Sequence, residues 1–325
     1  MPMKNLKVLA GFLITIILFV FLLRDLDFEL FFKYVLEGEI WLISIGVVVY
    51  ISSFVVRGLR WKILLKHLKD FELPELTMLT VSGYAVNNIF PVRIGEFTRA
   101  WITGNRNGVS RTSVLASIFV ERIFDGLTIA LILSVTLFFY PFPGNVKTLA
   151  YMASALFGLL FMFVLLGTFS DKPLRLIVFM RQKLPKFASF FFDVAEKFLK
   201  GASSLDSPRQ ILVVTLLSIT VWVFELSVYI LISNAFHIDI PLAGYLFMLC
   251  AANLGMLAAP TPGGLGVFQA AIVYALKSFS ILYEKRMAVA VVLHMSQIIP
   301  ITVIGLIWLY KNHISISSVQ NDKDY

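Results

Sequence analysis

The chain has 325 residues, of which 58% are hydrophobic and 15% are charged, whereas soluble proteins average about 45–50% and about 25%. This composition excludes an ordinary soluble enzyme, because a soluble fold of this size could not bury so much apolar surface. The 28 Lys and Arg against 20 Asp and Glu give a formal net charge of +8. The basic residues cluster in loops between apolar runs, so we interpret them as flanks of membrane spans and expect no binding of nucleic acid.

Six long apolar runs predict helices that cross the bilayer. Each is long enough to span a hydrocarbon core of roughly 30 Å at about 1.5 Å per residue. The first run has no small-residue cleavage site after it, so we expect an uncleaved anchor rather than a signal peptide. The runs are residues 6–23, 40–56, 113–140, 148–169, 211–233 and 287–310.

Two further apolar stretches, 76–90 and 242–259, lead into turns that contain Pro and Gly instead of into charged loops. If 76–90 crossed the bilayer fully, Arg106 and Arg111 would fall outside the cell, although basic residues prefer the cytoplasm. We therefore predict a re-entrant hairpin that enters and leaves on the cytoplasmic side, and a second one at 242–259 that enters from outside. Such broken backbone is tolerated only where it is buried in protein or lines a wet cavity.

The charge of the loops predicts their sides of the membrane. Residues 57–72 and 171–209 are rich in Lys and Arg and should face the cytoplasm, whereas 24–39 is acidic and should face outside. The mixture of Phe and Lys in 171–209, and a similar mixture in 60–68, predicts amphipathic helices on the cytoplasmic surface. We expect a multi-pass protein of the cell membrane with both termini in the cytoplasm.

The predicted fold is an all-α polytopic membrane protein, with about six transmembrane helices and two re-entrant hairpins in an inverted repeat. Residues 1–325 form one membrane domain, with a first half over 1–140 and an oppositely oriented second half over 148–310. Pro91 and Gly95 share their spacing with Pro262 and Gly266. Inverted repeats with broken segments are typical of transporters, although chance similarity in an apolar chain is an open alternative.

Three charged residues, Glu121, Arg122 and Asp125, lie inside the apolar run 113–140. Each charge costs about 3 kcal/mol near the centre of a membrane helix, so the three unpaired would cost on the order of 9 kcal/mol. They must pair, face the bundle interior or line a wet pocket. Two interpretations stay open. These residues form either a salt bridge that locks helices together or a functional site.

The turn after 76–90 carries a second polar group. Arg93, Glu96 and Arg99 recur every third residue and could line one helix face. Because Arg binds phosphate through its bidentate fork, an anionic headgroup could displace a carboxylate from this group; alternatively, Arg93 and Arg99 extend to the membrane surface. The candidate headgroup cavity comprises Asn87, Asn88, Arg93, Glu96, Arg99, Glu121, Arg122 and Asp125.

The turn after 242–259 is rich in glycine. Such a loop can present backbone N–H groups to an anion at the start of a helix, but its glycines also allow close packing between helices. The candidate residues of this second broken segment are Pro262, Gly263, Gly264, Gly266 and Gln269.

Other polar residues in apolar runs give weaker signals. Glu225 could couple to protons or could be hydrogen-bonded in place. His294 is expected to be a satisfied interior histidine, because no metal-like cluster surrounds it. We predict no metal and no cofactor, and find no hydrolase or nucleotide-binding motif.

The motifs at Arg57–Trp61, Asn87–Arg99, Glu121–Asp125 and Pro262–Gly266 together resemble the flippase-like transmembrane family. This is the membrane region of lysylphosphatidylglycerol synthases and of their stand-alone bacterial and archaeal relatives, and the resemblance covers nearly the whole chain. It implies an inverted-repeat fold that moves or presents an anionic or aminoacylated lipid. It also implies that the headgroup cavity holds Arg93, Glu96, Glu121, Arg122 and Asp125.

Two departures from the family pattern matter. The synthases carry a soluble aminoacyl-transfer domain after the membrane region, whereas this chain stops at Tyr325, so we do not expect synthesis of aminoacyl lipid. We predict that the chain is not an enzyme. Family members often have Glu a few residues after the glycine loop, where this chain has Gln269, so an acid role there is not expected.

The sequence therefore favours a flippase-like transporter of anionic phospholipid, aminoacyl-lipid or polyprenyl-phosphate-linked lipid, with membrane lipids as its partners. One alternative is a membrane enzyme or accessory factor in lipid-linked glycan synthesis. Another is an ion-coupled solute carrier that uses Glu225 or Asp125 as a proton site.

Overall fold

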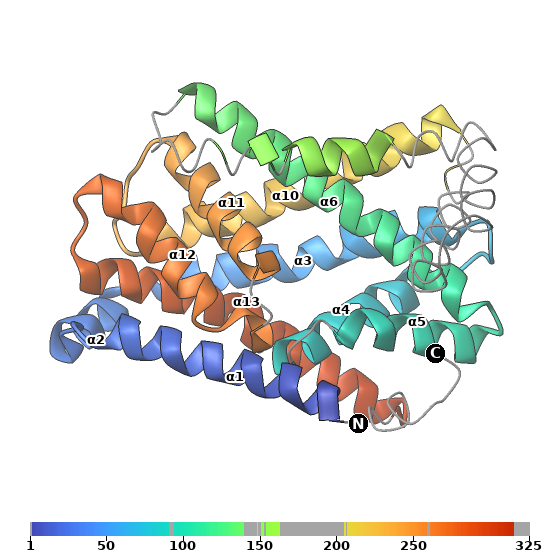
Figure 1. Cartoon of the computed structure of the whole chain (residues 1–325), viewed down its shortest axis with the longest axis horizontal. Coiled ribbons are helices and arrows are strands. Elements are labelled where there is room, and N and C mark those ends of the chain that lie inside the picture. Colours follow the sequence, from blue (N-terminus) through green and yellow to red (C-terminus); the bar gives the residue numbers. More distant parts are fainter. Residues whose placement is uncertain are drawn as a thin grey trace. The chain divides into compact units, whose positions relative to one another are not determined.

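A computed structural model describes residues 2–90, 94–139, 148, 151–152, 154–162, 205, 207–258 and 261–314. Over these ranges the chain is helical and has no strand, which confirms the predicted all-α class. The elements, shown in Figure 1, are α1 (Pro2–Leu23), α2 (Phe28–Glu37), α3 (Ile40–Leu65), α4 (Leu73–Ile89), α5 (Ile94–Asn107), α6 (Arg111–Phe139), α10 (Pro208–Ala235), α11 (Leu242–Ala258), η2 (Pro262–Gly264), α12 (Val267–Leu276), η3 (Lys277–Phe279) and α13 (Tyr283–Lys311).

Three helices, α3, α10 and α13, are long and apolar enough to cross a membrane. A fourth span is possible if α1 and α2, which meet at 95°, are counted together. The protein is therefore a membrane protein with several apolar helices, but the predicted number of six crossings is not reached among the described residues. The predicted crossing at 148–169 is described only in part, and the predicted amphipathic segment at 171–209 lies largely outside the described residues.

The chain folds into two compact units. The first unit consists of Met1–Phe54, Thr80–Thr98 and Trp222–Tyr325, and the second consists of Val55–Leu79 and Arg99–Val221. Each unit takes segments from both predicted halves, so the units do not follow the order of the chain. The inverted-repeat relation between the halves stays a prediction.

The first predicted hairpin is formed by α4 and α5, which are antiparallel. Near their turn, Gly95 lies so close to α4 that a Cβ atom there would clash with the carbonyl oxygen of Gly83. The Gly95 N–H also donates to Asn87 Oδ1 at 2.7 Å. At the end of the two helices that lies away from the turn, Asn107 Nδ2 donates to Glu75 Oε1 at 3.2 Å. The chain thus reverses direction where the sequence places its break.

The second predicted hairpin is formed by α11 and α12, which pack against each other. The turn between them has positive φ at Gly263 (55°), Gly264 (75°) and Gly266 (82°). Residues with a Cβ rarely adopt this conformation, so glycine is required for the sharp reversal. Helix α12 then packs against α13.

The two turns meet within the first unit. A Cβ atom on Gly263 would lie 2.9 Å from the carbonyl oxygen of Asn88, which places the η2 turn against the end of α4. Asn88 Nδ2 also donates to Thr302 Oγ1 of α13 at 2.9 Å. The two broken segments identified from the sequence are therefore in direct contact.

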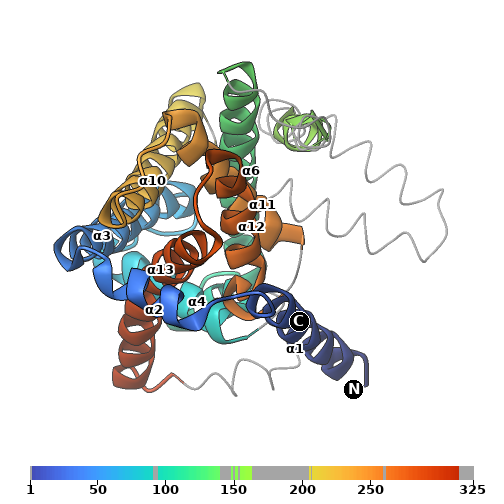
Figure 2. The same ribbon diagram turned by 90° about the vertical axis from the view of Figure 1, so that its left-hand side faces the viewer.

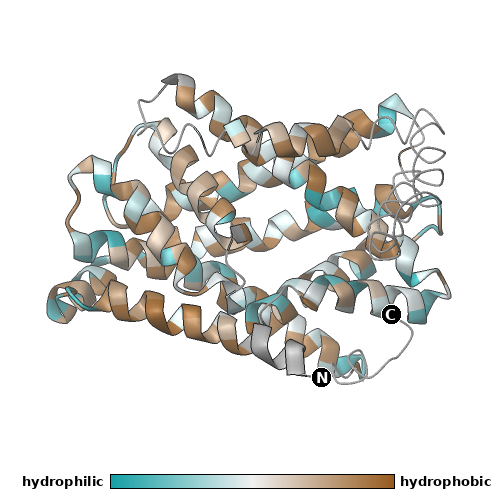
Figure 3. Cartoon of the chain, viewed as in Figure 1, coloured by the Kyte–Doolittle hydropathy of each residue, from teal (hydrophilic) through white to brown (hydrophobic). Residues whose placement is uncertain are grey.

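The acidic segment 24–39 contains a helix, α2, where the sequence analysis expected only a loop. Asp27 caps this helix by accepting a hydrogen bond from the Leu30 N–H at 3.1 Å. Its Phe28, Phe32 and Leu36 are exposed and recur every fourth residue, as in a helix that lies along a membrane surface. Figure 2 shows α2 running across one end of the first unit, and Figure 3 shows apolar residues along the neighbouring α1.

Candidate functional site

Helices α3, α5 and α6 bring five charged side chains together in the second unit. The residues are Arg60 from α3, Arg99 from α5, and Glu121, Arg122 and Asp125 from α6. We call this group the charged cluster. Four of its members are at most 6% exposed, and Arg122, with a side chain 23% exposed, forms its outer edge.

Glu121 lies at the centre of the charged cluster. Its Oε1 accepts a hydrogen bond from Arg122 Nη2 at 2.8 Å and lies 3.3 Å from Arg60 Nη2. Its Oε2 accepts from Arg99 Nη2 at 3.3 Å. One carboxylate therefore holds guanidinium groups from three helices.

Asp125, one helical turn further along α6, has two of the same partners. Its two oxygens accept hydrogen bonds from Nη1 and Nη2 of Arg60, in the bidentate geometry that makes Arg–carboxylate pairs strong. Arg122 Nη1 lies 3.2 Å from its second oxygen. Arg60 is thus the residue that ties both carboxylates of α6 to α3.

Polar and aromatic contacts fix the orientation of the guanidinium groups. Arg60 Nη1 donates to Ser218 Oγ of α10 at 2.8 Å. The buried Trp61 ring lies 3.9 Å below the Arg99 guanidinium carbon, and its Nε1 donates to Ser117 Oγ at 3.0 Å. The hydrogen-bonded indole supports the Arg99 guanidinium from one side, because a cation–π contact favours that position of the charge.

The charged cluster carries more positive than negative charge. Three guanidinium groups face two carboxylates, which leaves one positive charge among these five residues. In the described part of the chain, Nε and Nη1 of Arg99 and Nε of Arg60 are buried without a hydrogen-bond acceptor. A buried donor without a partner costs about 1–3 kcal/mol, so an anion that accepted these hydrogen bonds would be stabilised here.

The charged cluster contains four of the eight residues predicted to form the headgroup cavity, which are Arg99, Glu121, Arg122 and Asp125. Asn87, Asn88 and Glu96 belong to the first unit, and Arg93 lies outside the described residues. The alternative in which Arg99 extends to the membrane surface is wrong, because its side chain is 1% exposed. Whether these residues form a headgroup site stays a prediction.

Arg60 was missed as a site residue. The sequence analysis ended the membrane span at 56 and assigned 60–68 to a surface helix, but α3 continues to Leu65 and buries Arg60, Trp61, Leu64 and Leu65 completely. The available signal was the spacing, since Arg60, Trp61 and Leu64 fall on one face of a continued helix. The surface assignment was wrong for Arg60, because the carboxylates of α6 give its guanidinium group buried partners.

The glycine-rich turn uses its backbone donors internally. The N–H groups of Gly264 and Leu265 donate to the carbonyl oxygens of Thr261 and Pro262, and the Gly266 N–H donates to Gln269 Oε1 at 2.8 Å. These three donors are occupied, which disfavours the prediction that they bind an anion. The close approach of Gly263 to α4 favours the alternative, in which the glycines allow tight packing.

Gln269 and His294 join this turn to α13. Gln269 Nε2 lies 3.0 Å from His294 Nδ1. The ring stacks on Phe268 with centroids 4.1 Å apart. His294 is therefore a satisfied interior histidine, as predicted. Glu225 is likewise buried and accepts a hydrogen bond from Gln297 Nε2 at 3.3 Å.

Comparison with known proteins identifies relatives over most of the chain. The family model for the lysylphosphatidylglycerol synthase TM region matches residues 8–305. Glycosyltransferase AglD of Haloferax volcanii is 24% identical over 302 residues, which cover 82% of this chain and 48% of that protein. A UPF0104 membrane protein of Methanocaldococcus jannaschii is 25% identical over 69% of this chain and 93% of its own length. Another, from Methanothermobacter thermautotrophicus, is 22% identical over 81% of each chain.

These relatives confirm the resemblance drawn from the motifs and correct one expectation. The matched region spans about half the length of the glycosyltransferase. The expectation that the chain is not an enzyme is wrong, because the family is named for a synthase and one relative is named a glycosyltransferase.

Proposed function

Because the chain belongs to the lysylphosphatidylglycerol synthase TM region family, we propose that it acts in lipid-linked glycan synthesis and binds the phosphate of a lipid carrier at its charged cluster. The name of the glycosyltransferase relative supports a role in glycan assembly. The basic loops support a place in the cell membrane with cytoplasmic termini. Anionic lipids are then the partners of the site.

The observation that carries this proposal is the surplus of buried guanidinium donors. A lipid phosphate brings negative charge and several acceptor oxygens into an apolar environment, where an unpaired charge is costly. The charged cluster offers one net positive charge and unoccupied N–H groups on Arg99. Arginine suits this ligand because its planar fork matches phosphate geometry.

Arg99 is the guanidinium group that can most easily exchange its carboxylate partner for a phosphate. Glu121 has three guanidinium partners, so it keeps Arg60 and Arg122 when Arg99 turns to a phosphate. Among the described residues, Arg99 has one carboxylate partner, Glu121, at 3.3 Å. The partly exposed Arg122 then provides the edge from which the headgroup enters.

The test is a binding titration of the purified protein in nanodiscs with farnesyl phosphate, and with farnesol as the uncharged probe. We expect farnesyl phosphate to bind more tightly than farnesol, and Arg99→Gln to weaken its binding about tenfold, since hydrogen bonds to charged groups contribute about 1.5–3 kcal/mol. Arg106→Gln is the matched control, because Arg106 lies on the same helix and is exposed. Equal binding of both probes, or an unchanged Kd in Arg99→Gln, would contradict the proposal.

A second candidate function, movement of the carrier lipid between leaflets, is favoured by the contact between the two broken segments. Transporters place their sites where paired broken helices meet, and Gly263 lies against Asn88 at this point. Leaflet exchange of a fluorescent lipid phosphate in reconstituted vesicles tests this function. Exchange at the rate of protein-free vesicles would count against it.

A further inference from the structure

One face of α10 carries four buried polar side chains within the first unit. They are Trp222, Glu225, Tyr229 and Ser233, each at most 6% exposed, and we call them the α10 polar face. At about 100° per residue, they lie within about 80° of one another round the helix. Glu225 lies ten residues before the end of α10. That is about 15 Å along the axis, or half of a hydrocarbon core of roughly 30 Å.

Three members of the α10 polar face have hydrogen-bond donors that the described part of the chain does not use. Trp222 Nε1, Tyr229 Oη and Ser233 Oγ are buried without a partner there. Ser233 differs in this respect from the other hydroxyl residues of α10. Those residues donate to the carbonyl oxygen four positions earlier, and they are Thr215, Ser218, Thr220 and Ser227. Because an unmet buried donor is destabilising, three on one face point to bound acceptors such as water.

Glu225 lies among groups that can serve both of its protonation states. Gln297 Nε2 of α13 donates to Glu225 Oε1 at 3.3 Å, which stabilises the ionised carboxylate. The same amide has a carbonyl oxygen, which accepts from the protonated acid once the amide rotates. Tyr229 lies one turn further along α10, and its hydroxyl both donates and accepts. The site therefore suits Glu225 with and without a proton.

Other titratable groups lie around this site on the neighbouring helices. Among the described residues they are Tyr50 of α3, Cys250 of α11 and His294 of α13. The first two interact electrostatically with Tyr229, and the Phe268 ring of α12 lies between Tyr229 and the histidine. Tyr and Cys are ordinarily neutral at about pH 7. His294 is therefore the group whose titration an experiment must separate from that of Glu225.

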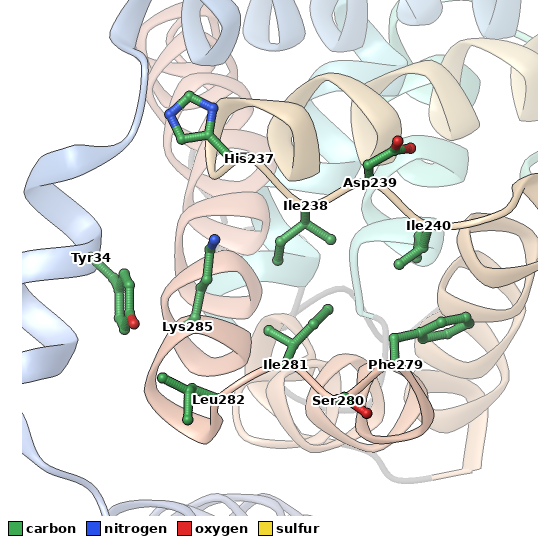
Figure 4. Close-up of a pocket in the computed structure, with 10 residues that line it drawn as sticks. All are labelled: Tyr34, His237, Ile238, Asp239, Ile240, Phe279, Ser280, Ile281, Leu282 and Lys285. Carbon is green, nitrogen blue, oxygen red and sulfur yellow. The ribbon is translucent and has the colours of Figure 1, made fainter.

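A pocket of about 320 Å³ lies at the Ser233 end of the α10 polar face (Figure 4). The loop that follows α10 lines it with His237, Ile238, Asp239 and Ile240. The Ile238 N–H donates to the Ser233 carbonyl oxygen at 3.0 Å, so one short loop joins the pocket to Ser233. The exposed lining is mostly polar, as expected of a pocket that holds water. The loop charges predict that this end of α10 faces outside.

From these observations we propose that Glu225 is a proton-exchange site, and that water from the pocket carries protons to it past Ser233 and Tyr229. On uptake, a hydronium ion gives its proton to the carboxylate, which leaves water and a neutral carboxylic acid; release reverses this step. A proton fits better than a metal cation, because the indole N–H of Trp222 can only donate. Carboxyl groups within membrane spans commonly serve as proton relays. The site uses no residue of the charged cluster, so it is independent of phosphate binding there.

The experiment follows the C=O stretch of protonated carboxylic acids by infrared spectroscopy. It uses the full chain in nanodiscs, from about pH 4 to about pH 10. We expect a band from an acid in apolar surroundings that disappears as the pH rises and is absent from Glu225→Gln. The band should persist in the control Glu37→Gln, because Glu37 is exposed on α2. A C=O band does not report on imidazole, so the titration of His294 does not contribute.

Two further variants test the role of the α10 polar face. Tyr229→Phe keeps the ring but removes a hydroxyl that stabilises the carboxylate, so the midpoint of the titration should rise by about one pH unit, a tenfold change in proton affinity. Ser233→Val should slow the shift of the band in D₂O, because an apolar side chain then replaces a hydroxyl on the path.

The outcomes are distinct for the site and for the path. A band that does not titrate, a band that survives in Glu225→Gln, or an unchanged midpoint in Tyr229→Phe would overturn the proposed proton site. If Glu225→Gln does not fold, the midpoint in Tyr229→Phe still decides. Exchange in D₂O as fast in Ser233→Val as in the unaltered protein would overturn the path from the pocket.

Discussion

The replacement Arg60→Met tests the energetic role of the charged cluster. Arg60 binds both oxygens of Asp125, contacts Glu121 and donates to Ser218. Without it, Asp125 keeps one guanidinium partner among the described residues, Arg122, at 3.2 Å. Removing one partner of a buried ion pair typically costs about 3–5 kcal/mol, because the remaining charge is left uncompensated.

The matched control is Lys62→Met on the same helix. Lys62 pairs with Asp70 at 3.2 Å, but their side chains are 34% and 84% exposed, so this change should cost at most about 1 kcal/mol. The assay is the free energy of unfolding in mixed micelles, followed by the loss of helical signal on titration with a denaturing detergent. The double variant Arg60→Met with Asp125→Leu should recover most of the loss, since both charges are then removed. If Arg60→Met were as stable as Lys62→Met, the cluster would not hold the second unit together.

Three further substitutions test other parts of the structure. Gly95→Ala should prevent α4 and α5 from packing and reduce the yield of folded protein, whereas Gly158→Ala, with no atom within 4 Å, should not; size-exclusion chromatography distinguishes the two. Trp61→Leu removes the ring under the α5 guanidinium and an indole hydrogen bond, and should lower the free energy of unfolding by about 1–3 kcal/mol. Gln269→Leu leaves His294 without its Nδ1 partner and should lower the free energy of unfolding by about 1–3 kcal/mol in the same assay. An unchanged free energy of unfolding would contradict a stabilising role for this contact.

Much of the fold could be predicted from hydropathy and helix-breaking residues. The runs at 40–56, 211–233 and 287–310 correspond to the long apolar helices α3, α10 and α13, because membrane length dictates such segments. Both turns also occur where Pro and Gly interrupt apolar stretches, since proline and glycine disfavour a continuous helix. The side of the membrane that each turn faces is not fixed by these local rules.

The charged cluster could be predicted only in part. Glu121, Arg122 and Asp125 had to find partners because charges are costly inside an apolar run, but their main partner on α3, Arg60, was assigned to a helix on the membrane surface. The positive-inside rule counts Lys and Arg near span ends and does not distinguish a solvated Lys62 from a buried Arg60. That distinction depends on which helix packs alongside, which is a tertiary property.

The most direct test of the central claim is a cryo-electron microscopy map of the protein in nanodiscs with farnesyl phosphate. We predict phosphate density within hydrogen-bond distance of Arg99, with Glu121 still bound by Arg60 and Arg122. Phosphate density elsewhere, or an occupied lipid site with Arg99 still paired to Glu121, would contradict the account.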